Sequence, residues 1–242
     1  MDFWKKVISL ILIITGLIMI CIVWMKYFRI KKEYQNIRTE VLTKVGNDKN
    51  IINWNKLKNV NENVAAWITV PGTEVDYPVV MAKDNEYYLS HDISGNSSQY
   101  GAIFFDARYS YISPFKASNL ILYGHNMGHW TNVMFGDLEK YKSKEFYDKH
   151  NRIILYTRKA IYEYQIISVM KVFSNDRWFD FVMEDKEHPL EAMFKYATES
   201  SLYQCRLPER IDDKFISLST CDYNDTYRLV IVGNKMKEKK IK

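Results

Sequence analysis

The stretch SLSTCDYNDTYRLVIVG, residues 217–233, decides how the rest of the sequence is interpreted. Two runs rich in apolar and β-branched residues flank a short polar connection, a pattern typical of two antiparallel strands joined by a turn. In such a hairpin Cys221 lies roughly opposite Arg228, with Cβ atoms about 5 Å apart. Because side chains alternate along a strand, Cys221 shares its face with Ser217 and Ser219. The pattern therefore predicts a thiol beside polar groups and a guanidinium.

This neighbourhood is suited to a reactive cysteine. A free thiol has a pKa of about 8.5, and a nearby positive charge favours the thiolate. The guanidinium of Arg228 can also donate to the oxyanion that forms when a thiolate attacks a carbonyl group. The alternative is that Cys221 is a small buried side chain that only packs on a strand. The residues of the hairpin leave both interpretations open.

A thiolate nucleophile needs a proton donor for the leaving group, and histidine suits this role because its pKa lies near neutrality. Of five histidines, His125 directly follows an apolar strand candidate, NLILYG, and would be held at a strand end. His129 lies four residues on, but no third metal ligand accompanies the pair. We therefore predict no metal and no cofactor.

The N-terminal region contains a candidate membrane anchor. Residues 7–24 form a run of eighteen residues without a charge, and a helix of that length, about 27 Å, just crosses a bilayer core. No small-residue cleavage site follows, so an uncleaved anchor is favoured over a signal peptide. Residues 1–6 are then a short tail in front of the anchor. The more basic flank lies on the C-terminal side, which leaves the orientation open.

Positive charge is concentrated at the two ends. The chain carries a net charge of +5, while residues 1–32 alone carry +5 and a basic tail, residues 235–242, carries +4. The body between them is therefore net negative. A nucleic-acid-binding domain would need a basic face on the fold itself, so we predict no nucleic-acid partner.

The body has the pattern of a mostly β domain. We expect a polar helical stalk over residues 25–49, helical structure over 53–66, and then short strands. The strand candidates are the two runs around Pro71 and Gly72, and residues 102–105, 120–123, 152–156, 161–173, 215–221 and 227–232. A long insertion at 174–210 has helical spacing after Pro189. The whole predicts a closed barrel with peripheral helices.

At this point the sequence resembles class B of the sortases. SLSTC resembles the TLxTC signature of the family, with Ser217 in place of the leading threonine. Three further segments are similar to that class: DYPVVMAKDNEYYLSHD (76–92), GAIFFDAR (101–108) and YGHNMGHWTNVMFGDLEKY (123–141). The resemblance covers residues 50–234 in the right order, as one catalytic domain. It implies an eight-stranded sortase-type barrel with N-terminal helices, a helix between strands six and seven, and one preceding transmembrane helix.

The resemblance also implies roles. Cys221 attacks the threonine carbonyl of a sorting pentapeptide, His125 protonates the departing amine, and Arg228 stabilises the oxyanion. Ser219, Thr220 and Asp222 are weaker candidates for binding substrate. The expected partners are surface proteins with a C-terminal sorting signal and an amine of a peptidoglycan precursor that resolves the thioester. The resemblance also implies that the catalytic domain lies outside the cell, anchored in the membrane by a single pass, with residues 1–6 as a short cytoplasmic tail.

Two other functions remain open from the sequence. A plain cysteine endopeptidase would release free acid whatever amine is present, and a non-catalytic wall-associated module would tolerate loss of Cys221. Arg206 and Arg210 are alternative guanidinium donors. Cys205 matches no motif and is interpreted as a packing residue, although a disulfide to Cys221 is conceivable and would silence the thiol.

Overall fold

A computed structural model describes most of the chain. The described residues are 2–45, 49–111, 114–128, 131–183, 189–221 and 226–241, with the backbone alone at residues 2, 44, 45, 49, 50 and 221. The chain divides into two compact units, Met1–Ile52 and Asn53–Lys242. Each is described by itself.

The first unit contains one long helix and a small hairpin. Helix α1 (Asp2–Val41) is followed by β1 (Leu42–Val45) and β2 (Lys49–Ile52), which pair antiparallel. Among the described residues α1 is the one helix long and apolar enough to cross a membrane, and no residue of its apolar window is buried. The stalk was expected to stay helical beyond residue 41. That expectation is wrong, because the chain enters a strand pair there, in agreement with the β-branched Thr43 and Val45.

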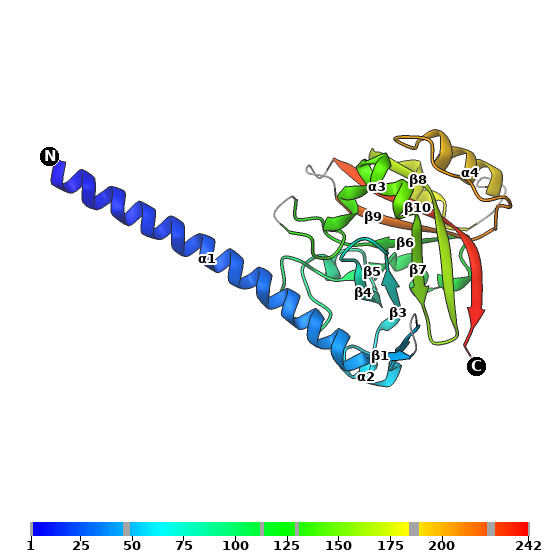
Figure 1. Cartoon of the computed structure of the whole chain (residues 1–242), viewed down its shortest axis with the longest axis horizontal. Coiled ribbons are helices and arrows are strands. Elements are labelled where there is room, and N and C mark those ends of the chain that lie inside the picture. The colour runs from blue at the N-terminus through cyan, green and yellow to red at the C-terminus, as the bar shows by residue number, and fades with distance from the viewer. Residues whose placement is uncertain are drawn as a thin grey trace. The chain divides into compact units, whose positions relative to one another are not determined.

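The second unit is an eight-stranded closed barrel, as predicted (Figure 1). The strand order around it is β10-β8-β7-β3-β4-β5-β6-β9. The strands are β3 (Val64–Thr69), β4 (Asp76–Met81), β5 (Ile103–Phe105), β6 (Asn119–Tyr123), β7 (Arg152–Tyr156), β8 (Ala160–Phe173), β9 (Phe215–Cys221) and β10 (Tyr227–Lys240). Two neighbour pairs, β4 with β5 and β6 with β9, are parallel, and the other pairs are antiparallel.

Short helices surround the barrel. The α-helices are α2 (Trp54–Val60), α3 (Lys144–Lys149) and α4 (Leu190–Glu199), and the 3-10 helices are η1 (Tyr87–Leu89), η2 (Ala107–Ser110), η3 (Pro114–Lys116), η4 (Gly136–Lys142) and η5 (Arg177–Asp180). Asn53 caps α2 by accepting a hydrogen bond from the Lys56 amide at 3.1 Å. The expected helix over 53–66 is therefore too long, since it ends at Val60 and β3 begins at Val64.

The longest ribbon of the barrel pairs β8 with β10. We expected the last strand to end near residue 232, but β10 continues to Lys240, where it pairs with Ala160. This part of β10 is rich in lysine, so its composition does not indicate a strand. A register shift at Val232/Gly233 marks a bulge. A Cβ at Gly233 would lie 2.9 Å from Cβ of Tyr164, so this close packing favours glycine.

The insertion between β8 and β9 contains α4, as the sequence predicted (Figure 1). Met193 and Ala197 of α4 are fully buried in one cluster with Trp178. The indole of Trp178 donates a hydrogen bond of 3.0 Å to the hydroxyl of Ser217 on β9. Burial of each large apolar side chain stabilises the folded state by about 1.5–3 kcal/mol. These contacts fix the insertion to the strand that carries the predicted nucleophile.

Candidate active site

Strand β9 is the centre of the site. It lies between β6, which directly precedes His125, and β10, which carries Arg228. It pairs in parallel with β6, with Tyr123 opposite Ser219, and antiparallel with β10. Arg228 is the register partner of Cys221, which is the pairing that the sequence predicted. For Cys221 the structure describes the backbone alone, so the orientation of its thiol lies outside the described residues.

His125 is brought to the same edge by β6. The amide of Gly124 donates to the carbonyl of Ser219 at 3.2 Å, which extends the parallel ladder one step past β6. Tyr123 and Ser219 are register partners, and His125 and Cys221 lie two residues after them on their respective segments. Because neighbouring strands lie about 4.8 Å apart, the backbones at His125, Cys221 and Arg228 reach one end of the barrel together.

The imidazole of His125 is oriented by a hydrogen bond to a backbone carbonyl. Its Nε2 lies 2.7 Å from the carbonyl oxygen of Leu89, so this nitrogen carries the hydrogen and donates it. Gly101 makes room for this arrangement. A Cβ there would lie 3.1 Å from Cδ2 of His125 and 2.3 Å from the carbonyl of Tyr88, and the φ of +58° also favours glycine. The ring orientation is thus set by a loop distant in sequence.

His125 and Arg228 line one cavity of about 480 Å³, here called the His125 cavity. Arg228 is partly buried, and its Nη1 donates to the backbone carbonyl of Tyr227 at 3.0 Å. The wall also includes Ser219 and Thr220. The structure therefore brings together four of the six side chains that the sequence singled out. Asp222 lies outside the described residues.

Ser219 and Thr220 carry the most informative polar groups of the wall. Each is 1% exposed. Neither hydroxyl oxygen has a hydrogen-bond partner among the described residues. Buried hydroxyl groups in folded proteins are normally hydrogen-bonded, and an unpaired one costs about 1–3 kcal/mol. Both hydroxyls therefore keep hydrogen-bonding capacity that no described residue uses.

A buried carboxylate behind this wall was not predicted from the sequence. Asp106, 1% exposed, accepts hydrogen bonds from Arg108 Nε at 2.8 Å, from the Tyr123 hydroxyl at 2.9 Å and from Asn85 at 3.4 Å. Tyr123 and Asn85 line the His125 cavity. Burial alone would raise the pKa of Asp106, but the hydrogen bonds and charge of Arg108 and the Tyr123 hydroxyl outweigh it and lower the pKa. The only sequence signal is an Asp directly after a buried strand.

The insertion contributes to the cavity through its first residues. Ser174 and Phe179 line it, and the Phe179 ring lies 6.3 Å from the ring of Tyr123. Through these two residues the insertion forms part of the cavity wall. The alternative donors Arg206 and Arg210 are not among the lining residues that the structure describes.

Cys205 is a free thiol and is buried. Its sulfur lies 3.7 Å from the hydroxyl of Ser201, and burial raises the pKa of the thiol. Cys205 therefore forms no disulfide with any described side chain. The interpretation of Cys205 as a packing residue agrees with these contacts.

Comparison with known proteins identifies relatives of one kind. The family described as "Sortase domain" matches residues 68–236. Sortase B of Listeria monocytogenes is 33% identical over 184 residues, which cover 73% of this chain and 71% of the relative. The crystal structure of sortase B from Bacillus anthracis in complex with AAEK1 superposes with a TM-score of 0.73 at 28% identity, covering 88% of this chain and 99% of that one. For Clostridium perfringens sortase B the TM-score is 0.68 at 29% identity, covering 76% and 100%.

Proposed function

Because the chain belongs to the sortase family, as a class B sortase, we propose that it is a membrane-anchored cysteine transpeptidase with Cys221 as its nucleophile. Family membership carries the general activity, which is sorting of proteins to the cell wall by transpeptidation. The substrate, the acceptor, the anchoring and the roles of single residues are the content of the proposal.

The observation that carries the residue roles is the position of β9 between β6 and β10. This pairing puts the backbone of Cys221 beside that of Arg228. The side chains of His125 and Arg228, which proton transfer and oxyanion stabilisation need, both line the His125 cavity. A thiolate is the reactive form of cysteine, and the adjacent guanidinium favours it. No cofactor is needed, since attack, proton transfer and oxyanion stabilisation are all available from these three residues.

In the first step the Cys221 thiolate attacks the carbonyl carbon of threonine in the sorting pentapeptide. Arg228 donates hydrogen bonds to the oxyanion, the C–N bond breaks, and His125 gives its proton to the departing amine. The product is a thioester on Cys221. Because Leu89 holds Nε2–H, we assign the proton that moves to Nδ1 of His125.

In the second step an amine of a peptidoglycan precursor attacks the thioester carbonyl. The amine loses its proton to His125, the C–S bond breaks, and the thiolate is restored. Water in place of the amine would give a free acid, as in an endopeptidase. The fate of the thioester therefore separates the two activities.

The unpartnered hydroxyls of Ser219 and Thr220 suit an extended peptide in the His125 cavity. A peptide backbone brings both donors and acceptors, and hydroxyl groups can pair with either. We propose that both bind the sorting peptide. Asp222, which follows the nucleophile directly, remains a candidate for the same task.

The experiment uses the full chain in detergent and a library of fluorogenic pentapeptides, with and without diaminopimelate or oligoglycine. We expect cleavage to speed up or its product to change when the amine is added, and mass spectrometry to detect a thioester on Cys221. Cys221→Ala and His125→Ala should abolish cleavage. Cys205→Ala is the matched control and should retain it. Free acid as the sole product under every condition would support the endopeptidase instead.

We further propose that residues 7–24 of α1 anchor the chain in the cell membrane by a single pass, with the catalytic unit outside. The support is the length and exposed apolar surface of the helix, together with the cell-surface site of sortase action. Protease added to intact protoplasts should degrade the second unit. Protection of that unit until the membrane is opened would reverse the orientation.

A further inference from the structure

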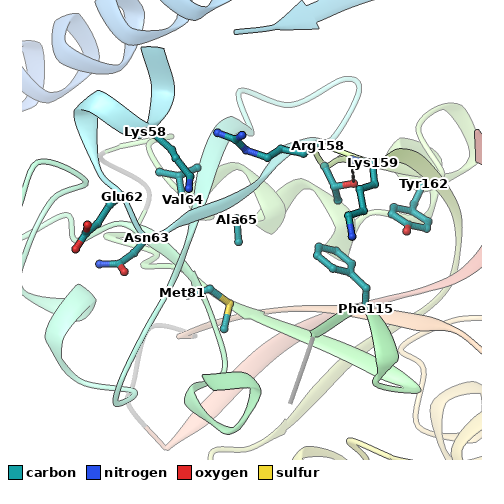
Figure 2. A pocket seen from close by; sticks show the side chains of 11 residues that line it. Lys58, Glu62, Asn63, Val64, Ala65, Met81, Phe115, Arg158, Lys159 and Tyr162 are labelled. Atoms are coloured by element: carbon teal, nitrogen blue, oxygen red, sulfur yellow. Dashed lines mark hydrogen bonds between the residues drawn. The ribbon is translucent and has the colours of Figure 1, made fainter. Parts of the chain in front are cut away.

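A second cavity of about 580 Å³ lies in the catalytic unit and shares no lining residue with the His125 cavity. We call it the basic pocket (Figure 2). Its wall is built from Lys58 of α2, the first residues of β3, Phe115 of η3, the turn between β7 and β8, and Tyr162 of β8. The proposed transpeptidation uses none of these residues.

The charge of this pocket is unbalanced. Lys58, Arg158 and Lys159 line it, with Glu62 as the one acidic lining residue. In the part of the chain that the structure describes, no carboxylate forms an ion pair with any of the three cations. By contrast, Arg152 on β7 of the same barrel is paired with Glu163 at 3.4 Å. An unneutralised positive cluster around a concave surface attracts an anion.

The side chains are directed to fit such an anion. Figure 2 shows the guanidinium of Arg158 pointing toward the side that carries Lys58, and the amine of Lys159 pointing toward the ring of Phe115. The carboxylate of Glu62 points away from them. Nη2 of Arg158 donates to the carbonyl of Trp54 at 3.1 Å, which fixes the guanidinium and leaves its remaining N–H donors for a ligand.

The opposite wall is aromatic and apolar. The rings of Phe115 and Tyr162 stack with their centroids 5.9 Å apart and their planes at 8°. Met81, Val64 and Ala65 add apolar surface. Inorganic phosphate alone would leave this surface unused. A phosphate ester with a glycerol, sugar or hydrocarbon group attached would use both walls.

We propose that the basic pocket binds a phosphate ester, with the phosphate on Arg158, Lys159 and Lys58 and the attached group on Phe115 and Tyr162. Arginine and lysine are the usual phosphate ligands of proteins, and the fork of arginine matches phosphate oxygens. The ester could come from an anionic lipid headgroup or from a soluble phosphate ester. The lipid source rests on the proposed membrane anchor, because Lys58 follows residue 24 by 34 positions in the chain.

The test uses the full chain in nanodiscs that contain photoactivatable phosphatidylglycerol or, as the neutral arm, photoactivatable phosphatidylcholine. Cross-linked peptides are identified by mass spectrometry. We expect the peptide around residues 157–163 to be labelled at least fivefold more by phosphatidylglycerol. In a parallel arm, glycerol phosphate is titrated into chains in phosphatidylcholine nanodiscs and followed by phosphorus NMR line broadening.

The variant R158Q/K159Q should lose the labelling and the line broadening. The control K149Q/K195Q removes the same charge from α3 and α4 and should retain both. Saturable binding of glycerol phosphate without lipid labelling, lost in R158Q/K159Q, would assign the soluble source. Equal labelling by both lipids with no binding of glycerol phosphate, or equal loss in the control, would overturn the site.

Peptide cleavage measured in the same nanodiscs separates this proposal from the transpeptidase. R158Q/K159Q should cleave the peptide at the wild-type rate, because the basic pocket and the His125 cavity have separate walls. Binding of the phosphate ester by a chain that cleaves no peptide would contradict the proposed transpeptidase activity and leave the proposed phosphate-ester site standing.

Discussion

The hydroxyl of Tyr123 donates a hydrogen bond of 2.9 Å to the carboxylate of Asp106, and of the two only Tyr123 lines the His125 cavity. Asp106 also binds Arg108 and Asn85. A single buried carboxylate thereby positions two side chains of the cavity wall without reaching the cavity.

Asp106→Ala should destabilise the catalytic unit. Its loss leaves the Tyr123 hydroxyl without its acceptor and removes the charged partner of Arg108, which together cost about 2–4 kcal/mol. Chemical unfolding followed by tryptophan fluorescence measures the effect. The control Asp148→Ala breaks an exposed pair with Lys144 on α3 and should cost under about 1 kcal/mol. Equal losses in the two variants would contradict the role of Asp106.

The same carboxylate predicts a pH dependence of stability. Its pKa in the folded protein is lowered from the ordinary value of about 3.9. The stabilisation is therefore complete above that value and is lost as the pH falls through the lower folded pKa. The unfolding free energies of wild type and Asp106→Asn should differ by a constant amount down to about pH 4 and converge below it. A difference that grows on acidification would show the opposite sign.

Gly101→Ala should reduce both stability and activity. A left-handed φ costs a non-glycine residue about 1–2 kcal/mol, and the new Cβ would also press on the carbonyl of Tyr88 and the ring of His125. Displacing a catalytic ring by about 1 Å can cost 100-fold in rate. Gly95→Ala is a matched control, since its φ of +82° is similar but its nearest atom is 3.5 Å away. It should lose stability and keep kcat.

Arg228→Ala should lower kcat for peptide cleavage by about 100- to 1000-fold, the usual cost of removing one oxyanion donor. Arg228→Lys keeps the charge without the planar fork, so we expect only partial recovery. Arg152→Ala removes an exposed guanidinium from β7 and should leave kcat unchanged. A rise in KM alone for Arg228→Ala would make it a binding residue.

Much of the barrel could be predicted from the sequence because most of its strands are rich in β-branched and aromatic residues. The edges were harder to predict. β10 runs to Lys240 because its lysines alternate along a ribbon paired with β8, and their charge conceals the period. Helix α1 ends at Val41 because the next residues pair with β2, a contact that local helical spacing does not report.

Residues that belong to a motif could be assigned to the site from the sequence, and His125, Ser219 and Arg228 do line the His125 cavity. The hydrogen bond from His125 to Leu89 joins residues 36 apart, and that from Tyr123 to Asp106 joins residues 17 apart. The basic pocket likewise gathers Lys58, Phe115 and Arg158 from three distant segments. Such contacts depend on the closed barrel and have no local pattern.

The pairing of Lys240 with Ala160 has a practical consequence for anyone shortening this chain. Truncation after residue 234 would remove the part of β10 that pairs with the first residues of β8, among them Tyr162. An expression variant trimmed for solubility would then expose an unpaired sheet edge, a template for aggregation. Purification tags are better attached beyond Lys242 than substituted for the lysines before it.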